Sequence, residues 1–241
     1  IPGKKIVINL APADMHKKGS GYDVPIALGI IAASRQRTMP ALGEYLIMGE
    51  LGLDGTVREI TGALPIVELA IKSGLQGCIL PLNSAIEAIE FGDIRIYGVE
   101  NLDEVLRIVE GGTCDDLLVG NRTAVKDCAG LSGADTVPSC NYDTMDFSEI
   151  IGQEAAKRGL EIAAAGGHHA LLIGSPGSGK SSLAKAMVNI LPDLSLEEAV
   201  QTSKVYSVAG KGNPGGGLIK ERPFRAPHYS ASPAALLGGG S

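Results

Sequence analysis

The 241-residue sequence has no apolar run long enough to cross a membrane. A helix that spans a bilayer needs roughly 18 apolar residues in succession. The sequence also lacks the charged and then apolar opening of a secretory signal peptide. We therefore expect a cytoplasmic protein with no membrane partner. Because the chain starts at Ile1, without a methionine, we also expect a fragment of a longer protein.

Cysteine is scarce, and no two cysteines form a Cys-x-x-Cys pair. The four are Cys78, Cys114, Cys128 and Cys140. Free thiols in a reducing compartment are the interpretation we favour, and a zinc site built from the last three is the alternative. The sequence also has fewer basic than acidic residues. The formal net charge of −6 argues against general affinity for nucleic acid, although a local basic surface remains compatible with it.

The composition is that of a globular protein, with 44% hydrophobic and 20% charged residues, and the length allows two domains. In residues 1–112, strand-like and helix-like segments alternate, which predicts an α/β or α+β domain. The expected strands are 5–10, 46–50, 77–81 and 95–99, and the expected helices are 23–33, 63–73, 84–90 and 102–109. Asp54-Gly55 between two strand-like runs predicts a hairpin that makes the sheet partly antiparallel.

Periodicity fades over residues 113–146, where Gly, Ser, Asp and Asn dominate, so we interpret this stretch as a solvated linker. Residues 147–241 form the second expected domain. It opens with a helix over 154–165 that ends at Gly166-Gly167. The two domains are therefore predicted at 1–112 and 147–241.

Residues 174–181 fit the phosphate-binding pattern G-x-x-x-x-G-K-[ST] at every fixed position. An apolar run at 169–173 predicts a buried strand before this stretch, and residues 182–191 predict a helix after it. Strand, glycine loop and helix together are the context that the motif requires.

Each residue type in the loop has a chemical reason. Glycines let successive backbone N–H groups turn toward phosphate oxygens, and the start of the helix adds partial positive charge. Lys180 supplies a full charge to the β- and γ-phosphates, and the Ser181 hydroxyl is a ligand for Mg²⁺. We therefore predict a site for ATP and Mg²⁺. Its candidate residues are Gly174, Ser175, Pro176, Gly177, Ser178, Gly179, Lys180, Ser181 and Ser182.

Four further stretches carry a family resemblance: 9–14, 22–29, 49–55 and 222–230. With them the chain resembles the ComM/YifB group of magnesium-chelatase-like AAA+ ATPases. The resemblance implies a Lon-protease-like α+β domain, of the ribosomal S5 domain 2-like fold, followed by a partial P-loop AAA+ domain. It also implies a homo-oligomer that forms a hexameric ring.

The same resemblance places Ile151 and Gly152 against the adenine, although by the residues alone Ile151 could equally belong to the core. It also raises the question of a Lon-type peptidase, which needs a serine activated by a lysine. The lysine position falls at Pro65, and the serine position falls near Gly21 or Tyr22. Ser20 is close by but has no general base, so we expect no peptidase activity.

Between residues 203 and 228 basic residues outnumber acidic ones. They are Lys204, Lys211, Lys220, Arg222 and Arg225. This local basic patch predicts contact with DNA, and packing against a neighbouring subunit is an equally supported alternative.

The resemblance implies a motor that couples ATP hydrolysis to DNA remodelling, including branch migration in natural transformation. The alternatives are a chelatase-type subunit that remodels a protein partner for insertion of Mg²⁺ into a porphyrin, and a nucleotide-binding module without hydrolysis. The acids after Ser181 are Asp193, Glu197, Glu198 and Glu221, and none ends a buried apolar strand. We therefore expect this chain to bind ATP without hydrolysing it.

Overall fold

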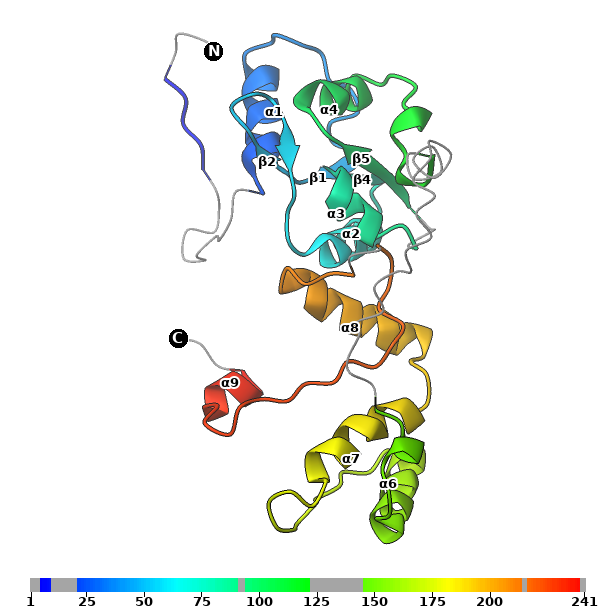
Figure 1. The fold of residues 1–241 in the computed structure, drawn as a ribbon. Coiled ribbons are helices and arrows are strands. Elements are labelled where there is room, and N and C mark those ends of the chain that lie inside the picture. Colours follow the sequence, from blue (N-terminus) through cyan, green and yellow to red (C-terminus); the bar gives the residue numbers. More distant parts are fainter. Residues whose placement is uncertain (1–4, 10–20, 91–93, 122–144, 214–215, 239–241) are drawn as a thin grey trace. The chain divides into compact units, whose positions relative to one another are not determined.

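The computed structural model describes residues 5–9, 21–90, 94–121, 145–213 and 216–238. The chain forms two compact units, one of residues 1–138 and 198–219 and one of residues 139–197 and 220–241. The predicted second domain, 147–241, is therefore divided between them. Most of helix α8 (Leu196–Val208) belongs to the first unit (Figure 1).

A parallel three-stranded sheet forms the centre of the first unit. Its order is β1 (Tyr45–Ile47), β4 (Gly77–Pro81) and β5 (Arg95–Val99). The strands β2 (Glu50–Leu51) and β3 (Val57–Arg58) pair with each other as a separate antiparallel ribbon. The expectation that the hairpin makes the central sheet partly antiparallel is therefore wrong.

Gly49 explains why the chain leaves the central sheet between β1 and β2. Its N–H donates to the Gly21 carbonyl, and its carbonyl accepts from the Val24 N–H, so both groups face the start of α1 and not a strand. A Cβ at position 49 would lie 2.8 Å from Val57 Cγ1, so any other residue would force Val57 or the backbone to move. The ribbon thus begins where glycine permits a close approach.

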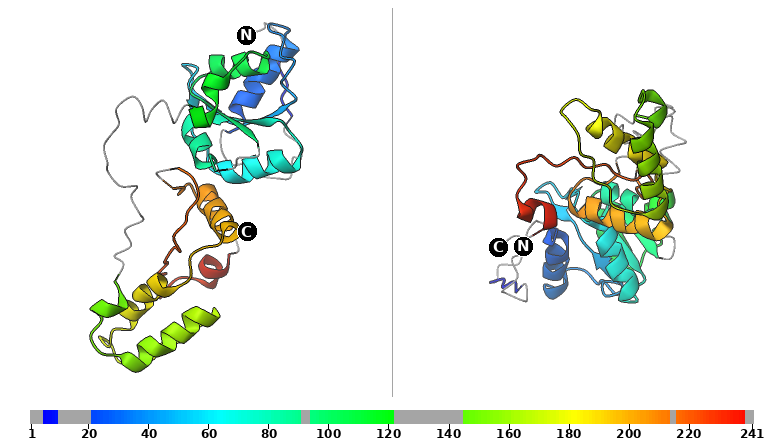
Figure 2. Two further views of the ribbon diagram at one scale, coloured as in Figure 1. Left: turned by 90° about the vertical axis from the view of Figure 1, so that its right-hand side faces the viewer. Right: turned by 90° about the horizontal axis from the view of Figure 1, so that it is seen from below.

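Helices cover both faces of the parallel sheet (Figure 1; Figure 2). The helices are α1 (Asp23–Ala33) and α4 (Leu102–Val109) on one face, and α2 (Ala63–Lys72) and α3 (Leu82–Glu87) on the other. Successive side chains of β4 point to opposite faces of the sheet and so contribute to the apolar core on each face. Ile79 packs with α1 and α4, whereas Cys78 and Leu80 pack with α2 and α3. The first unit is therefore an α/β fold of three layers.

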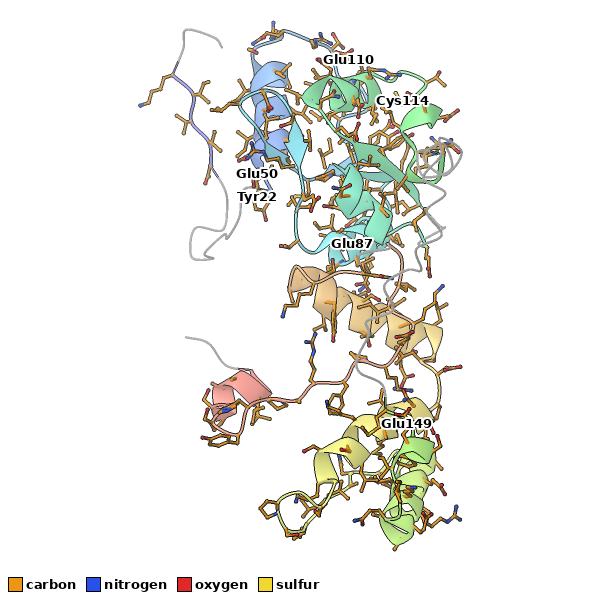
Figure 3. All side chains as sticks on the ribbon, in the orientation of Figure 1. Tyr22, Glu50, Glu87, Glu110, Cys114 and Glu149 are labelled. Carbon is orange, nitrogen blue, oxygen red and sulfur yellow. The ribbon has the colours of Figure 1, made fainter. Side chains whose placement is uncertain are left out.

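Helix α8 packs against α2 and α3 within the first unit. Val200 and Leu218 join the apolar cluster of those helices. The Gly62 N–H donates to the Ser207 carbonyl at 3.0 Å, and the Ser207 hydroxyl donates to Glu87 at 2.8 Å. Glu87 lies on α3 (Figure 3). These long-range contacts place α8 with a part of the sequence more than 100 residues earlier.

The first unit extends beyond residue 112 into the predicted linker. The 3₁₀ turn η1 (Asp115–Leu117) packs on the sheet, where Leu117 and Cys114 are buried and Leu118 bridges to Tyr97. The start of the predicted linker is thus part of the core. Most of the rest, together with Cys128 and Cys140, lies outside the described residues.

The described residues of the second unit form helical elements besides the start of α8. They are η2 (Phe147–Glu149), α6 (Glu154–Gly166), α7 (Lys180–Ala186) with its continuation η3 (Met187–Ile190), and α9 (Pro233–Leu237). The α6 side chain of Leu160 and the α7 side chain of Leu183 are buried. Among the residues described in either unit, no helix has the length and apolar character to cross a membrane.

Two predicted strands are not strands. Among the described residues, 5–9 have no ladder partner, and neither do residues 169–173, where Leu171 is 83% and Ile173 is 88% exposed. A strand is stabilised by its hydrogen-bonded neighbour, and in the described part of the second unit no strand is present to pair with. These apolar runs are therefore extended but unpaired.

Candidate functional site

The glycine loop before α7 has the backbone that its sequence predicts. Gly177 (φ 79°) and Gly179 (φ 85°) are both left-handed, a conformation that other residues adopt only with strain. A Cβ built on either glycine meets no atom within 4 Å, so the space beside this backbone is open. The loop therefore turns through two left-handed residues, with open space beside both.

Lys180 is the first residue of α7, and its ammonium group lies inside the loop. Nζ donates to the carbonyl oxygens of Gly174 (2.8 Å) and Ser175 (2.6 Å) and contacts Ser178 Oγ at 3.3 Å. The loop thus holds a positive charge at its centre. Lys180, which carries this charge, is half-buried.

The first turn of α7 directs backbone N–H groups toward the same place. The N–H groups of Lys180, Ser181 and Ser182 precede the first intrahelical bond, which Leu183 donates to the Gly179 carbonyl at 2.9 Å. Gly179 provides no side-chain cap. These donors and the Lys180 ammonium suit an anion with several oxygens. Ser181 is exposed in the same turn.

A second segment, residues 145–153, contacts the loop; we call it the arm. Asp146 and Glu149 form a capping box around η2, and Glu149 is labelled in Figure 3. Lys157 Nζ of α6 donates to the Ile150 carbonyl at 2.5 Å. Gln153 Nε2 donates to the Ser178 carbonyl of the loop at 3.3 Å. The arm and the glycine loop are therefore joined within one unit.

Ile151, in the arm, is 96% exposed, so the alternative interpretation that it belongs to the core is wrong. Gly152 beside it is left-handed, with φ 74°. Both residues are thus accessible to a ligand. The sequence predicts these two as site residues but not Gln153, since nothing in a linear motif indicates a contact across 25 residues.

The residues of the predicted basic patch are shared between the two units. Lys204 pairs with Glu68 at 2.8 Å and has only 15% of its side chain exposed, which leaves little of it accessible to DNA. Arg222 Nε donates to the Pro192 carbonyl at 2.5 Å and braces the end of η3. Lys211 lies in the first unit, whereas Lys220 and Arg225 belong to the second.

The four acids after Ser181 all lie on exposed positions. Among the residues that the structure describes, no three His, Cys, Asp or Glu side chains gather as metal ligands. Cys78 and Cys114 are free thiols, in agreement with the favoured reading for these two. Burial raises the pKa of Cys78 to about 12, so this thiol is inert.

Two of the positions considered for a peptidase, Pro65 and Gly21, lie among the described residues. Pro65 lies in the first turn of α2. A Cβ at Gly21 would lie 3.2 Å from Met48 Cε and 3.5 Å from Ile60 Cγ2, so apolar groups occupy its surroundings. Ser20 and the neighbouring Lys17 and Lys18 lie outside the described residues.

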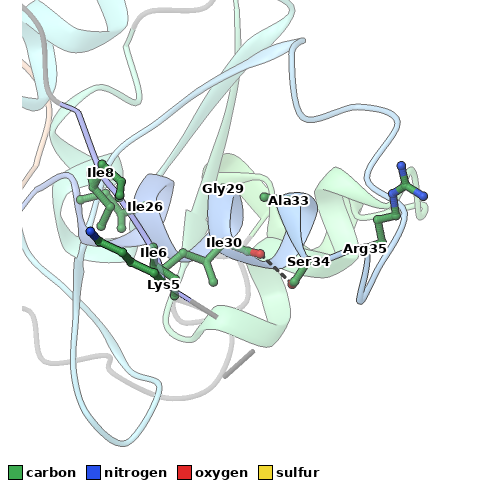
Figure 4. Close-up of a pocket in the computed structure, with 10 residues that line it drawn as sticks. Lys5, Ile6, Ile8, Ile26, Gly29, Ile30, Ala33, Ser34 and Arg35 are labelled. Atoms are coloured by element: carbon green, nitrogen blue, oxygen red, sulfur yellow. Dashed lines mark hydrogen bonds between the residues drawn. The ribbon is translucent and has the colours of Figure 1, made fainter. Parts of the chain in front are cut away.

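A cavity of about 720 Å³ lies elsewhere, in the first unit, between residues 5–8 and the outer side of α1 (Figure 4). Ile6, Ile8, Ile26 and Ile30 make its lining largely apolar. The hydroxyl of Ser34 donates to the Ile30 carbonyl at 2.7 Å. The cavity therefore offers little chemistry, and the glycine loop is the candidate site.

Two family matches cover most of the chain. Residues 146–241 match the family described as "Magnesium chelatase, subunit ChlI", and residues 1–84 match "Subunit ChlI of Mg-chelatase". Part of the chain is also similar to an archaeal Lon protease of Halobacterium salinarum, with 37% identity over 137 residues, 56% of this chain and 18% of the protease.

Two curated relatives match along the whole chain. YifB of Escherichia coli (strain K12) is 42% identical over 249 residues, which cover 100% of this chain and 44% of YifB. The competence protein ComM of Haemophilus influenzae is 38% identical over 240 residues, which cover 100% of this chain and 45% of ComM. The chain thus spans less than half the length of these relatives. With both halves matched, it belongs to the magnesium-chelatase-like family of ComM and YifB.

Proposed function

We propose that the glycine loop binds the triphosphate of ATP together with Mg²⁺, and that the chain is the nucleotide-binding part of a ComM-type AAA+ motor. The observation that carries this proposal is the Lys180 ammonium, which the loop encloses beneath two left-handed glycines. The proposed binding residues are Ile151, Gly152, Gly174, Ser175, Pro176, Gly177, Ser178, Gly179, Lys180, Ser181 and Ser182.

Lys180 supplies the central charge. An ammonium group has three donors, and here they meet neutral oxygens of the loop. A phosphate oxygen carries negative charge and forms a stronger, charge-assisted bond, so it competes well for one or more of these donors. The loop therefore keeps the charge in place until a phosphate arrives.

The remaining groups of the site suit different parts of Mg·ATP. The N–H groups of the first turn of α7 suit phosphate oxygens, and the Ser181 hydroxyl is the type of ligand that Mg²⁺ takes beside phosphates and water. The exposed side chain of Ile151 offers an apolar surface to the base. Bound Mg·ATP would supply the phosphoanhydride that a motor hydrolyses.

Replacement of one lysine tests the site. Lys180→Ala should weaken binding of a fluorescent ATP analogue by about 10- to 100-fold, the effect of charged hydrogen bonds worth roughly 1.5–3 kcal/mol. Lys185→Ala is the matched control, since Lys185 is an exposed lysine of the same helix. Equal affinity in wild type and Lys180→Ala would refute the assignment.

For the whole protein we propose a cytoplasmic, hexameric motor that remodels DNA in natural transformation. The support is the match of the entire chain to ComM, whose name describes a competence protein. Lys211, Lys220 and Arg225 are the basic residues we propose for contact with DNA. The alternative of a chelatase motor is favoured only by the descriptions of the two matched families.

A further inference from the structure

Gln153 has a backbone conformation that its side chain does not favour. It is left-handed, with φ 61°, and the only other such non-glycine residue among those described is Arg35 in the first unit. A strained residue persists where its surroundings or its function require that conformation. Gln153 is exposed, so burial in a core is not the requirement.

The strained backbone directs the side chain toward the glycine loop. Gln153 Nε2 donates to the Ser178 carbonyl, and Ser178 stands between the two left-handed glycines. The hydroxyl of Ser178 contacts the ammonium of Lys180. Gln153 thus binds the backbone of a loop residue whose side chain contacts the central charge.

Two other hydrogen bonds anchor the arm. Asn189 Nδ2 of η3 donates to the Met145 carbonyl at 3.2 Å, at the start of the arm. Lys157 Nζ donates to the Ile150 carbonyl, and only 14% of the Lys157 side chain is exposed. Exposed Ile151 and Gly152 therefore lie between an anchored carbonyl and the contact with the loop.

We propose that Gln153 is a positioning residue that fixes the distance between the base-binding arm and the phosphate-binding loop. This inference rests on the proposed function of the site. A rigid link of this kind contributes only when one ligand occupies both parts, because it prepays the cost of ordering them together. Gln153 should therefore strengthen binding of ATP but not of inorganic triphosphate, which has no base.

Two variants of the 241-residue chain separate the hydrogen bond from the strain. Gln153→Met keeps the length of the side chain and the left-handed strain but removes the donor, whereas Gln153→Gly removes both. Each should weaken ATP binding by about 2- to 10-fold, the range expected for one hydrogen bond, with inorganic tripolyphosphate affinity changed less than about twofold. The melting temperature of Gln153→Gly should equal or exceed that of Gln153→Met.

Arg158→Met is the control, because Arg158 belongs to the same region of α6 but pairs with Glu161 at 2.9 Å. It should leave both affinities unchanged. Unchanged ATP affinity in both Gln153 variants, or equal losses for ATP and tripolyphosphate, would overturn the inference. Failure of the wild-type chain to bind either ligand would instead overturn the proposed function, and this inference with it.

Discussion

The ion pair between Lys204 and Glu68 joins α8 to α2 at a distance of 2.8 Å. Lys72 approaches the same carboxylate, also at 2.8 Å. Hydrogen bonds from Lys204 and then Lys72 lower the pKa of Glu68 from its ordinary 4.5 to about 2. The carboxylate is about one-third exposed, so solvent and salt screen this stabilisation in part.

Lys204→Ala should lower the midpoint of thermal unfolding at pH 7. Because the pKa of Glu68 is depressed in the folded state, its stabilisation is present above pH 4.5 and is lost as the pH falls toward 2. The difference between variant and wild type should therefore shrink over that range. Lys211→Ala, at an exposed position, should unfold like wild type. An equal deficit at pH 2 and pH 7 would mean that packing, and not charge, is lost.

At the scale of elements, α4 shows how one side chain defines a helix start. The Asn101 side chain accepts from the Glu104 N–H at 3.0 Å, and Glu104 accepts from the Glu100 N–H at 2.9 Å. Asn101→Ala should cost about 1 kcal/mol of stability, the usual effect of losing a cap. Chemical denaturation measures it. Asn101→Asp keeps the acceptor and should stay near wild type, whereas equal losses would argue against a capping role.

Local patterns predict the elements whose apolar side chains face a core. The expected bounds of α1, α4, β4 and β5 match the structure, because their apolar side chains recur at the period that each core requires. Residues 5–9 and 169–173 have equally apolar sequences, yet neither forms a strand. Apolar character indicates burial in a strand, but only a neighbouring strand supplies the hydrogen bonds.

At the scale of the molecule, a feature can be predicted from the sequence when the residues that form it are neighbours in the chain. The glycine loop is predicted in detail because its residues are contiguous. The contact of Gln153 with Ser178 and the packing of α8 on α2 join residues far apart in sequence. These long-range contacts also decide where the two units divide, which composition along the chain did not indicate.

The chain should bind Mg·ATP but release phosphate only at background rate. Hydrolysis by a P-loop ATPase requires carboxylates that hold Mg²⁺ and orient the attacking water. The acids after Ser181 lie on exposed positions, and Asp193 follows the end of η3, where its carbonyl contacts Arg222. A steady-state phosphate assay with and without DNA measures turnover. Phosphate release that disappears in Lys180→Ala would show that one of these acids serves in catalysis.

Amide hydrogen exchange of the 241-residue chain, with and without Mg·ATP, tests the central claim most directly. We predict slower exchange at residues 174–183 and 150–153 in the wild type, since bound phosphate and base would protect both segments. Lys180→Ala should lose this protection, and the first unit should exchange equally with and without nucleotide. Protection confined to other segments, or none at saturating Mg·ATP, would contradict the assignment of the glycine loop as the nucleotide site.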